Sequence, residues 1–191
     1  STSSVSTYEG PIMTRFVVLL RGINVGGRNK VRMVDLRAAF EGAGFESVST
    51  YIQSGNVLVT GPGSPTDLET DIEAMLRNHF GLSLVVVVRT HEQRRAVVRT
   101  APNGCGAEPD TYFSDVVFLK APLTSEQAMG VIRLREGVDE AWPGEGVLYF
   151  QRLGARRTQS RMSTIVGSPE YQQMTIRNWS TTTTLLALLD G

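Results

Sequence analysis

The stretch that decides the fold is Phe16–Met33, which reads FVVLLRGINVGGRNKVRM. It opens with five apolar residues, Phe16 to Leu20, mostly β-branched or leucine, a composition typical of a buried strand. The rest combines glycines with basic residues and carries no acid: Arg21, Gly22, Gly26, Gly27, Arg28, Lys30 and Arg32. Backbone N–H groups and cationic side chains in such a loop bind anions, especially just before a helix. The stretch therefore predicts an anion-binding loop between a strand and a helix.

Two familiar phosphate-binding patterns are missing from this loop. No Gly-Lys-Ser/Thr closes it, so it is not a Walker A motif. Its glycines also lack the G-x-G-x-x-G order of a dinucleotide fingerprint. The residues favour an anion and identify no reaction.

Charge is balanced over the whole chain but unevenly distributed along it. The 191 residues include 19 Lys or Arg and 19 Asp or Glu, which favours neither a broad nucleic-acid surface nor an acidic tail. A second stretch without acids, Gly146–Pro169, carries Arg152, Arg156, Arg157 and Arg161. Two local basic patches in a neutral chain favour a focused anion site.

The compartment is indicated by cysteine usage and by the absence of long apolar runs. Cys105 is the only cysteine, so no intramolecular disulfide forms and a reducing compartment is indicated. No apolar run approaches the ~18 residues of a membrane span, and the opening residues lack the order of a signal peptide. We therefore expect a cytoplasmic protein without membrane contact. Residues 1–13 are expected to be a flexible extension or an expression remnant, with Met13 a candidate for the natural start.

Hydrophobic periodicity predicts two α+β halves. Residues 14–90 read as β-α-β-β-α-β, the ferredoxin-like arrangement, with Thr66 or Asp67 expected to cap the second helix. Residues 91–110 read as a connecting helix and a loop.

Residues 111–191 read as a smaller C-terminal α+β subdomain. A capping box at Thr124 predicts a helix to about Arg135, and Ser180 is expected to cap the last helix. The order of elements echoes that of the first half, although the two sequences are too dissimilar to establish a repeat.

Three segments together carry a resemblance to a known family. LLRGINVGGRNKVRM (Leu19–Met33), TYIQSGNV (Thr50–Val57) and TIRNW (Thr175–Trp179) resemble the signature segments of the domain of unknown function 1697 (DUF1697) family, in the family's order. The resemblance spans essentially the chain from Thr14 to Leu189. It implies an α+β fold in two subdomains, the first ferredoxin-like, and it implies no activity, because the family has none assigned.

The chain departs from the family pattern at two places. The family usually carries a Gly-x-Gly-Arg-Ser-Lys-like segment before its last helices, where this chain has Ala155–Arg161 and matches the Ser-Lys pair with Ser160-Arg161. A lysine is common in the final helix where this chain has Thr183 or Thr184. A phosphate site that depends on those positions is therefore weakened here.

Ten residues are candidates for ligand contact: Arg21, Asn24, Gly26, Gly27, Lys30, Ser54, Asn56, Arg161, Arg177 and Asn178. The basic residues would supply charge, the Asn and Ser side chains would orient a ligand, and the glycines would admit close approach. Each has a structural alternative: a solvated or strand-end cation, a turn residue that bonds its own backbone, or a glycine needed for positive φ. The sequence leaves both readings open.

No catalytic or metal-binding constellation is visible. Cys105 has no identifiable base beside it, and His79 and His91 lack the spacing of zinc ligands. The Asp139-Glu140 pair is poorly arranged for shared acid–base work. No metal is expected, and the catalytic residues and the cofactor stay unknown.

Three functions from different classes follow. The leading hypothesis is binding of a phosphate-bearing or other anionic small molecule, with a nucleotide among the candidates, at the loop after the first strand. The first alternative is an RNA- or single-strand-binding module, because ferredoxin-like sheets can present stacking aromatics, although the neutral charge weighs against it. The second alternative is a structural or protein-interaction domain without catalysis. Whether the protein is an enzyme, and its oligomeric state, are not determined by the sequence.

Overall fold

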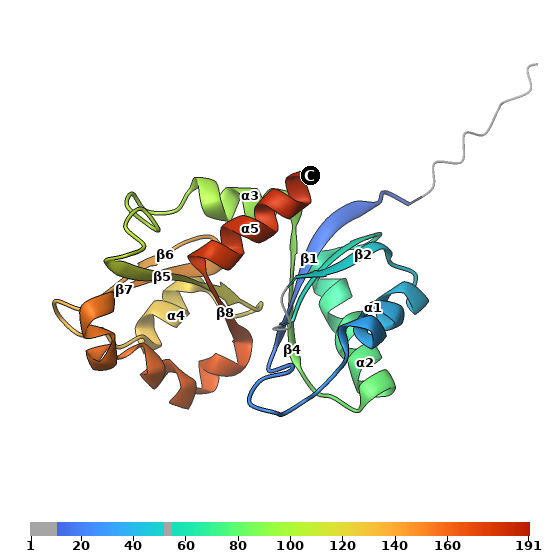
Figure 1. Ribbon diagram of the computed structural model, residues 1–191, viewed down its shortest axis with the longest axis horizontal. Coiled ribbons are helices and arrows are strands. Elements are labelled where there is room, and N and C mark those ends of the chain that lie inside the picture. The colour runs from blue at the N-terminus through green and yellow to red at the C-terminus, as the bar shows by residue number, and fades with distance from the viewer. Residues whose placement is uncertain (1–10, 52–54) are drawn as a thin grey trace, which may run out of the picture.

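The structure is a computed structural model that describes residues 11–51 and 55–191 (Figure 1). It contains two four-stranded antiparallel sheets, with helices on their faces and along their junction. The α+β class expected from the sequence is therefore confirmed. No helix in the described part of the chain has the length and apolar character needed to cross a membrane.

The first sheet has the strand order β2-β3-β1-β4 and is covered on one face by two helices. Its strands are β1 (Thr14–Arg21), β2 (Glu46–Tyr51), β3 (Asn56–Gly61) and β4 (Val85–Thr90). The helices are α1 (Met33–Gly42) and α2 (Pro65–Phe80). Figure 1 shows both helices on the outer side of this sheet.

The second sheet has the strand order β6-β7-β5-β8. Its strands are β5 (Tyr112–Leu119), β6 (Asp139–Pro143), β7 (Val147–Leu153) and β8 (Met174–Asn178). After β5 comes α4 (Ser125–Val131), and between β7 and β8 come three 3-10 turns, η1 (Gly154–Gln159), η2 (Met162–Gly167) and η3 (Pro169–Gln173). Helix α3 (His91–Arg99) follows β4, and α5 (Trp179–Asp190) follows β8.

The two halves correspond strand by strand. Replacing β1 to β4 by β5 to β8 converts one sheet order into the other, and α3 and α5, which contact each other, follow equivalent strands. In the register of the central strands, Val17 pairs with Arg89 and Val116 pairs with Arg177. Arg89 and Arg177 therefore occupy equivalent positions. The sequence echo was too weak to reveal this correspondence, which the strand order makes explicit.

Strand β1 is buried on both of its faces, which explains its continuous apolar sequence. Phe16, Val18 and Leu20 pack against the side chains of α1 and α2. Val17 and Leu19 point the other way, into a cluster with residues of α3, α5 and the second sheet. A third cluster lies on the far face of the second sheet, with residues of α4 and η2. The shared middle cluster joins the two sheets into one packed body.

Several expected helix ends were wrong. Ser64, not Thr66 or Asp67, caps α2 by accepting from the Asp67 N–H at 3.3 Å, because Pro65 suits the first helical position and starts the helix earlier. The side chain of Asn178, not Ser180, caps α5.

Helix α4 also ends earlier than expected. It stops at Val131 because Ile132 is extended, and the Arg135 N–H is bonded instead by Asp139 Oδ2 at 2.9 Å. The expected end near Arg135 was therefore wrong.

Candidate functional site

A cavity of about 610 Å³ lies where α5 begins, at one end of the second sheet. That volume is in the range of small-molecule sites. Its residues come from the loop before β5, from β5, from β7 and from the start of α5: Gly106, Pro109, Tyr112, Phe113, Ser114, Asp115, Arg152, Asn178, Trp179 and Ser180. Three aromatic rings and an oppositely charged pair therefore share one hollow.

Asp115 and Arg152 form the charged pair of this cavity. Arg152 Nη1 lies 3.7 Å from Asp115 Oδ2; the Asp115 side chain is largely buried, and that of Arg152 is partly buried. The same Nη1 donates to Met162 Sδ at 3.1 Å. Burial raises the pKa of the Asp115 carboxyl, and the Arg152 charge partly opposes that rise. Arg152 also lies over the Phe113 ring, 5.7 Å from its centroid. The cavity thus offers one acceptor and one cation beside aromatic walls.

Comparison with the first half makes this pair distinctive. The position equivalent to Asp115 in β1 is Phe16, which is fully buried in the first core. The position equivalent to Arg152 is Gly61. Two charged side chains therefore stand in the second half where the first half has an apolar residue and a glycine. Charges are rarely placed at such positions without a partner or a use.

The loop before β5 sets the position of the Trp179 indole. A Cβ on Gly106 would lie 2.2 Å from Trp179 Cδ1, and Gly106 has φ of +73°. Glycine is therefore required there both by the backbone and by the ring. The Gly106 N–H donates to Ser114 Oγ at 3.3 Å, which fixes the loop against β5.

Arg21, the first sequence candidate, is engaged in contacts between the halves. Its Nη1 donates to the Tyr171 and Met174 carbonyls, and its Nη2 donates to Gln172 Oε1 at 3.1 Å. Its guanidinium also lies 4.4 Å from the centroid of the Tyr171 ring. These contacts correspond to the structural alternative for this arginine.

Asn24 bonds within its own loop. Its side chain accepts from the Val31 N–H at 2.8 Å and donates to the Val31 carbonyl at 3.0 Å. Gly26 and Gly27 have φ of +58° and +75°, so positive φ alone accounts for glycine at both positions. Lys30 is exposed at the same loop. The loop is thus a closed turn with an exposed glycine-basic tip.

Two of the ten candidate residues, Asn56 and Arg177, lie in contact in the structure. Arg177 Nε donates to Asn56 Oδ1 at 2.7 Å, and Asn56 is 1% exposed. Arg177 Nη2 reaches the carbonyls of Leu20 and Gly55 at 3.0 and 3.3 Å. Burial lowers the pKa of Arg177 to about 10. Ser54, expected beside them, lies outside the described residues.

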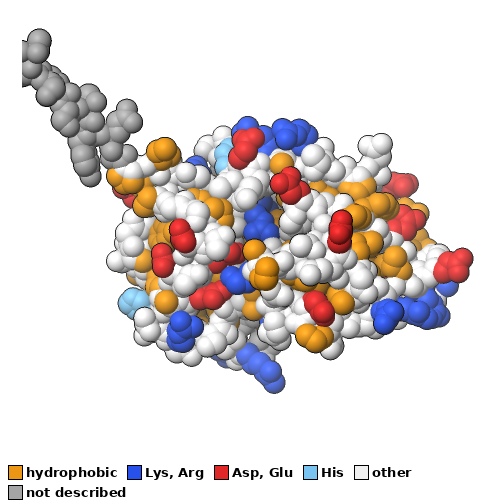
Figure 2. Space-filling model, turned by 180° about the vertical axis from the view of Figure 1, so that it is seen from behind, with side chains coloured by type: hydrophobic (Ala, Val, Ile, Leu, Met, Phe, Trp, Pro, Cys, Tyr) orange, Lys and Arg blue, Asp and Glu red, His pale blue; other side chains and the backbone are white. Residues whose placement is uncertain are grey.

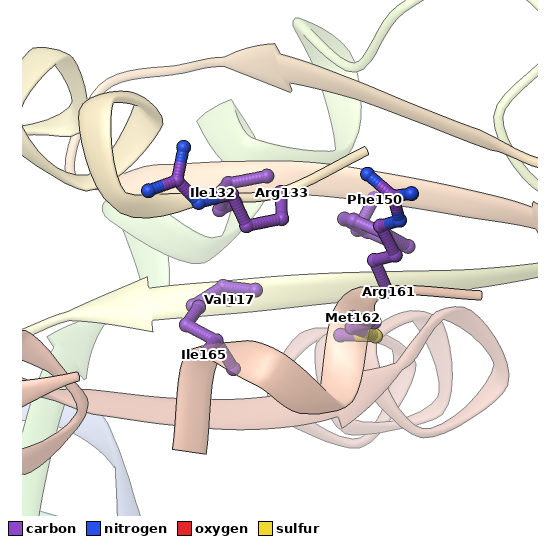
Figure 3. Close-up of a pocket in the computed structure, with 7 residues that line it drawn as sticks. All are labelled: Val117, Ile132, Arg133, Phe150, Arg161, Met162 and Ile165. Carbon is purple, nitrogen blue, oxygen red and sulfur yellow. The ribbon is translucent and has the colours of Figure 1, made fainter. Parts of the chain in front are cut away.

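Arg161 lies apart from these residues, on the far face of the second sheet. Figure 3 shows it in a hollow with Arg133, between Phe150 of β7 and Met162 of η2. The hollow has a cavity volume of about 0 Å³, so it cannot hold even a water molecule. The Arg161 N–H donates to Asp139 Oδ2 at 2.9 Å. Asn178, in contrast, lines the cavity at α5.

A second cavity, also of about 610 Å³, lies between α2, α3 and the second sheet. It is lined by Arg89 and Glu69 among others, and both side chains make hydrogen bonds to the protein backbone. Arg89 Nη2 donates to the Gly146 carbonyl at 3.2 Å, and Glu69 Oε2 accepts from the Val88 N–H at 3.1 Å. Figure 2 shows the back of the molecule, with basic atoms at the bottom of a central hollow and acidic side chains around it.

Metal and thiol chemistry receive no support. Within the described residues, no group of three or more His, Cys, Asp and Glu side chains could hold a metal ion. Cys105 is partly buried, and burial raises the pKa of its thiol, which disfavours the nucleophilic thiolate.

Asp115, Arg152 and Trp179 were missed as site residues by sequence reasoning. Asp115 is an acid directly before the apolar run Val116–Leu119, which is an available signal for a charge at the edge of a core. Arg152 was noted only as part of a basic stretch. Trp179 is marked in the sequence only as the end of the TIRNW segment; it packs on the middle cluster and lines the cavity.

The fold is similar to that of a known bacterial protein. The structure of the conserved bacterial protein SP0830 from Streptococcus pneumoniae is similar, with a TM-score of 0.79 and 26% identity, over 93% of this chain and 99% of that one. No curated protein matches the chain. The model of the family described as "Protein of unknown function (DUF1697)" matches residues 13–149, well over half of the chain. The chain therefore belongs to the DUF1697 family.

Proposed function

We propose that the protein binds a small molecule that carries both an aromatic ring and a phosphate, such as a nucleotide, in the cavity at the start of α5. The observation that carries the proposal is the Asp115–Arg152 pair set among Tyr112, Phe113 and Trp179 in a cavity of about 610 Å³. Aromatic walls stack on a planar ring, and the unlike charges suit a ligand that carries both hydrogen-bond donors and an anionic group.

The start of α5 supports the anionic end of such a ligand. Trp179 and Ser180 are the first residues of the helix and line the cavity. The N–H groups of a first turn lack partners within the helix, and the helix dipole favours an anion there. Arg152, which is paired with Asp115, supplies a cationic side chain in the same cavity. Asp115 would accept from an amino or hydroxyl donor on the ligand.

The proposal moves the site away from the loop after β1. Backbone carbonyls of the protein accept hydrogen bonds from the side chains of Arg21, Asn24 and Arg177. Lys30, Gly26 and Gly27 form the exposed tip of that loop. This tip is the alternative binding site for an anion. The two locations predict different variants.

Intrinsic fluorescence tests the proposal, because the chain has two tryptophans and Trp142 lies outside this cavity. In a W142F background, Trp179 alone reports on AMP and GMP, with adenosine and inorganic phosphate as half-ligands. We expect saturable quenching by the nucleotides. R152A should weaken binding about tenfold or more, the usual cost of a charge-assisted contact, whereas R161A and K30A should change it less than about twofold.

The opposite pattern overturns the proposal. Loss of binding in K30A with R152A unchanged would place the anion on the loop after β1. No quenching by any of these ligands, with isothermal titration calorimetry also silent, would reject small-anion binding at both places.

We also infer a ferredoxin-like first subdomain and a cytoplasmic protein. The order β2-β3-β1-β4 with two crossover helices on one face supports the first inference. A single, partly buried cysteine supports the second.

A further inference from the structure

Arg94 is a buried cation whose side chain is incompletely satisfied. It lies on α3, is 0% exposed, and donates from Nη2 to the Thr182 carbonyl of α5 at 3.1 Å. Its guanidinium carbon lies 4.6 Å from the centroid of the Phe118 ring. Among the described residues, its Nε and Nη1 have no hydrogen-bond partner. Two donor atoms of a charged group are thus buried and available.

The surroundings of Arg94 are themselves positive. Within residues 11–51 and 55–191, no carboxylate forms an ion pair with it. Burial first, and then the nearby charges of Arg177 and Arg89, lower the pKa of Arg94 to about 9. Those two arginines come from equivalent positions in the two halves, and Arg94 contacts Thr182, its own counterpart on α5. Two further positive charges, Arg177 and Arg89, therefore act on Arg94 at the junction of the halves.

Such a cluster is unfavourable without a negative charge. A buried guanidinium keeps its proton and loses its hydration, so burial is tolerated when an anion or a full set of acceptors replaces the water. Cation–π contact with Phe118 replaces part of that interaction. It leaves the Nε–H and Nη1–H donors unused.

We propose that Arg94 holds a buried inorganic anion of halide size, bound by Nε–H and Nη1–H on the junction between the two halves. Arg94 is 0% exposed and lines neither of the two cavities of about 610 Å³, so room for a phosphate ester is not seen beside it in the described part of the chain and the proposed anion is a monatomic one. The anion lowers the repulsion among the three arginines. This site is independent of the nucleotide proposal, which concerns the cavity at α5.

Thermal unfolding in matched salts tests the proposal. At constant ionic strength, the wild-type Tm should be higher in sodium bromide or chloride than in sodium gluconate, by about 5 °C once the halide exceeds its Kd about a hundredfold. R94M should abolish this halide dependence while R95M, on an exposed neighbour in α3, keeps it. In gluconate, R94M should unfold at or above the wild-type Tm, because no uncompensated charge stays buried.

Crystals of the wild-type protein grown in bromide give a second readout that needs no variant. An anomalous bromide peak within hydrogen-bond distance of Arg94 Nε and Nη1 is the expected result. Equal Tm values in bromide and gluconate would reject the anion. So would electron density beside Arg94 that gives no anomalous signal and refines as a water molecule.

Discussion

Arg89 and Arg177 occupy equivalent positions in the two halves, and each donates its Nη2 to two backbone carbonyls of the opposite half. The acceptors, again at equivalent positions, are Leu119 and Gly146 for Arg89 and Leu20 and Gly55 for Arg177. Guanidinium groups suit this task because their planar donors are always charged. The exchange binds each half to the end of the other half's central strand.

A second exchange uses the residues that end the central strands. Arg21 and Lys120 are equivalent in register, and they donate to the Met174 and Val86 carbonyls, which are also equivalent. Lys120 Nζ further pairs with Glu73 at 2.8 Å. The basic residues at the junction therefore have a shared structural role, which accounts for Arg21 without a ligand.

Replacing Arg177 should destabilise the protein. R177M leaves the Leu20 and Gly55 carbonyls without this donor in the interior, which should lower the free energy of unfolding by about 2–4 kcal/mol. R161A, at an exposed side chain, should change it by less than about 0.5 kcal/mol. Urea unfolding followed by circular dichroism measures both. An R177M variant as stable as R161A would contradict the structural role of the exchange.

The two equivalent glycines should differ in tolerance to alanine. Both Gly55 and Gly146 have positive φ, +84° and +69°, so both variants carry backbone strain. A Cβ on Gly55 would lie 2.6 Å from the Leu20 carbonyl oxygen, whereas one on Gly146 would meet only Arg89 Nη2 at 3.5 Å. G146A should cost about 1–2 kcal/mol, and G55A clearly more. Equal losses in denaturant unfolding would show that strain alone decides.

D115N should change how stability depends on pH. Burial raises the pKa of Asp115 in the folded protein above its ordinary 3.8, so the folded state binds this proton more tightly than the unfolded state. The buried charge is a cost above the folded pKa, and the cost falls as pH drops through that pKa toward 3.8. D115N should therefore raise the Tm at pH 7, by an amount that shrinks toward pH 4. E140Q, at an exposed acid of β6, controls for net charge. An advantage that grows toward pH 4 would contradict the burial effect.

Gly106 should be specific in its effect on Trp179. In the W142F background, G106A forces a methyl group into the indole ring and should shift the Trp179 emission and weaken nucleotide quenching. Gly104, with φ of +88° and open space around its Cβ, is the matched control: G104A bears comparable strain without the contact. Emission spectra of both variants decide the matter. Identical spectra would show that Trp179 is held by something other than this loop.

Local sequence predicted the elements because their signals are local. The apolar run Phe16–Leu20, the capping box at Thr124 and the β-α-β-β-α-β order of residues 14–90 each appear in the structure close to where they were expected. Errors fell on helix ends, where several polar residues compete to be the N-cap and Ser64 and Asn178 take that position. Such competition depends on backbone geometry that periodicity does not report.

The candidate site was only partly accessible to sequence reasoning. Asn178 was named and does line the cavity at α5. Asp115 and Arg152 lie far apart along the chain and become neighbours only because β5 pairs with β7. Arg21 and Arg177 were named for their charge, but the residue type alone does not tell whether the guanidinium will donate to a ligand or to a backbone carbonyl of the protein.

The sequence by itself determined the α+β class, the buried first strand and the family, because hydrophobic pattern and signature segments are properties of the chain. Only the tertiary structure decided that the halves correspond, that their arginines are exchanged across the junction, and that Asp115 and Arg152 share a cavity. The physical reason is that strand pairing joins residues distant in the chain, and buried charges take whichever acceptors that pairing brings within reach.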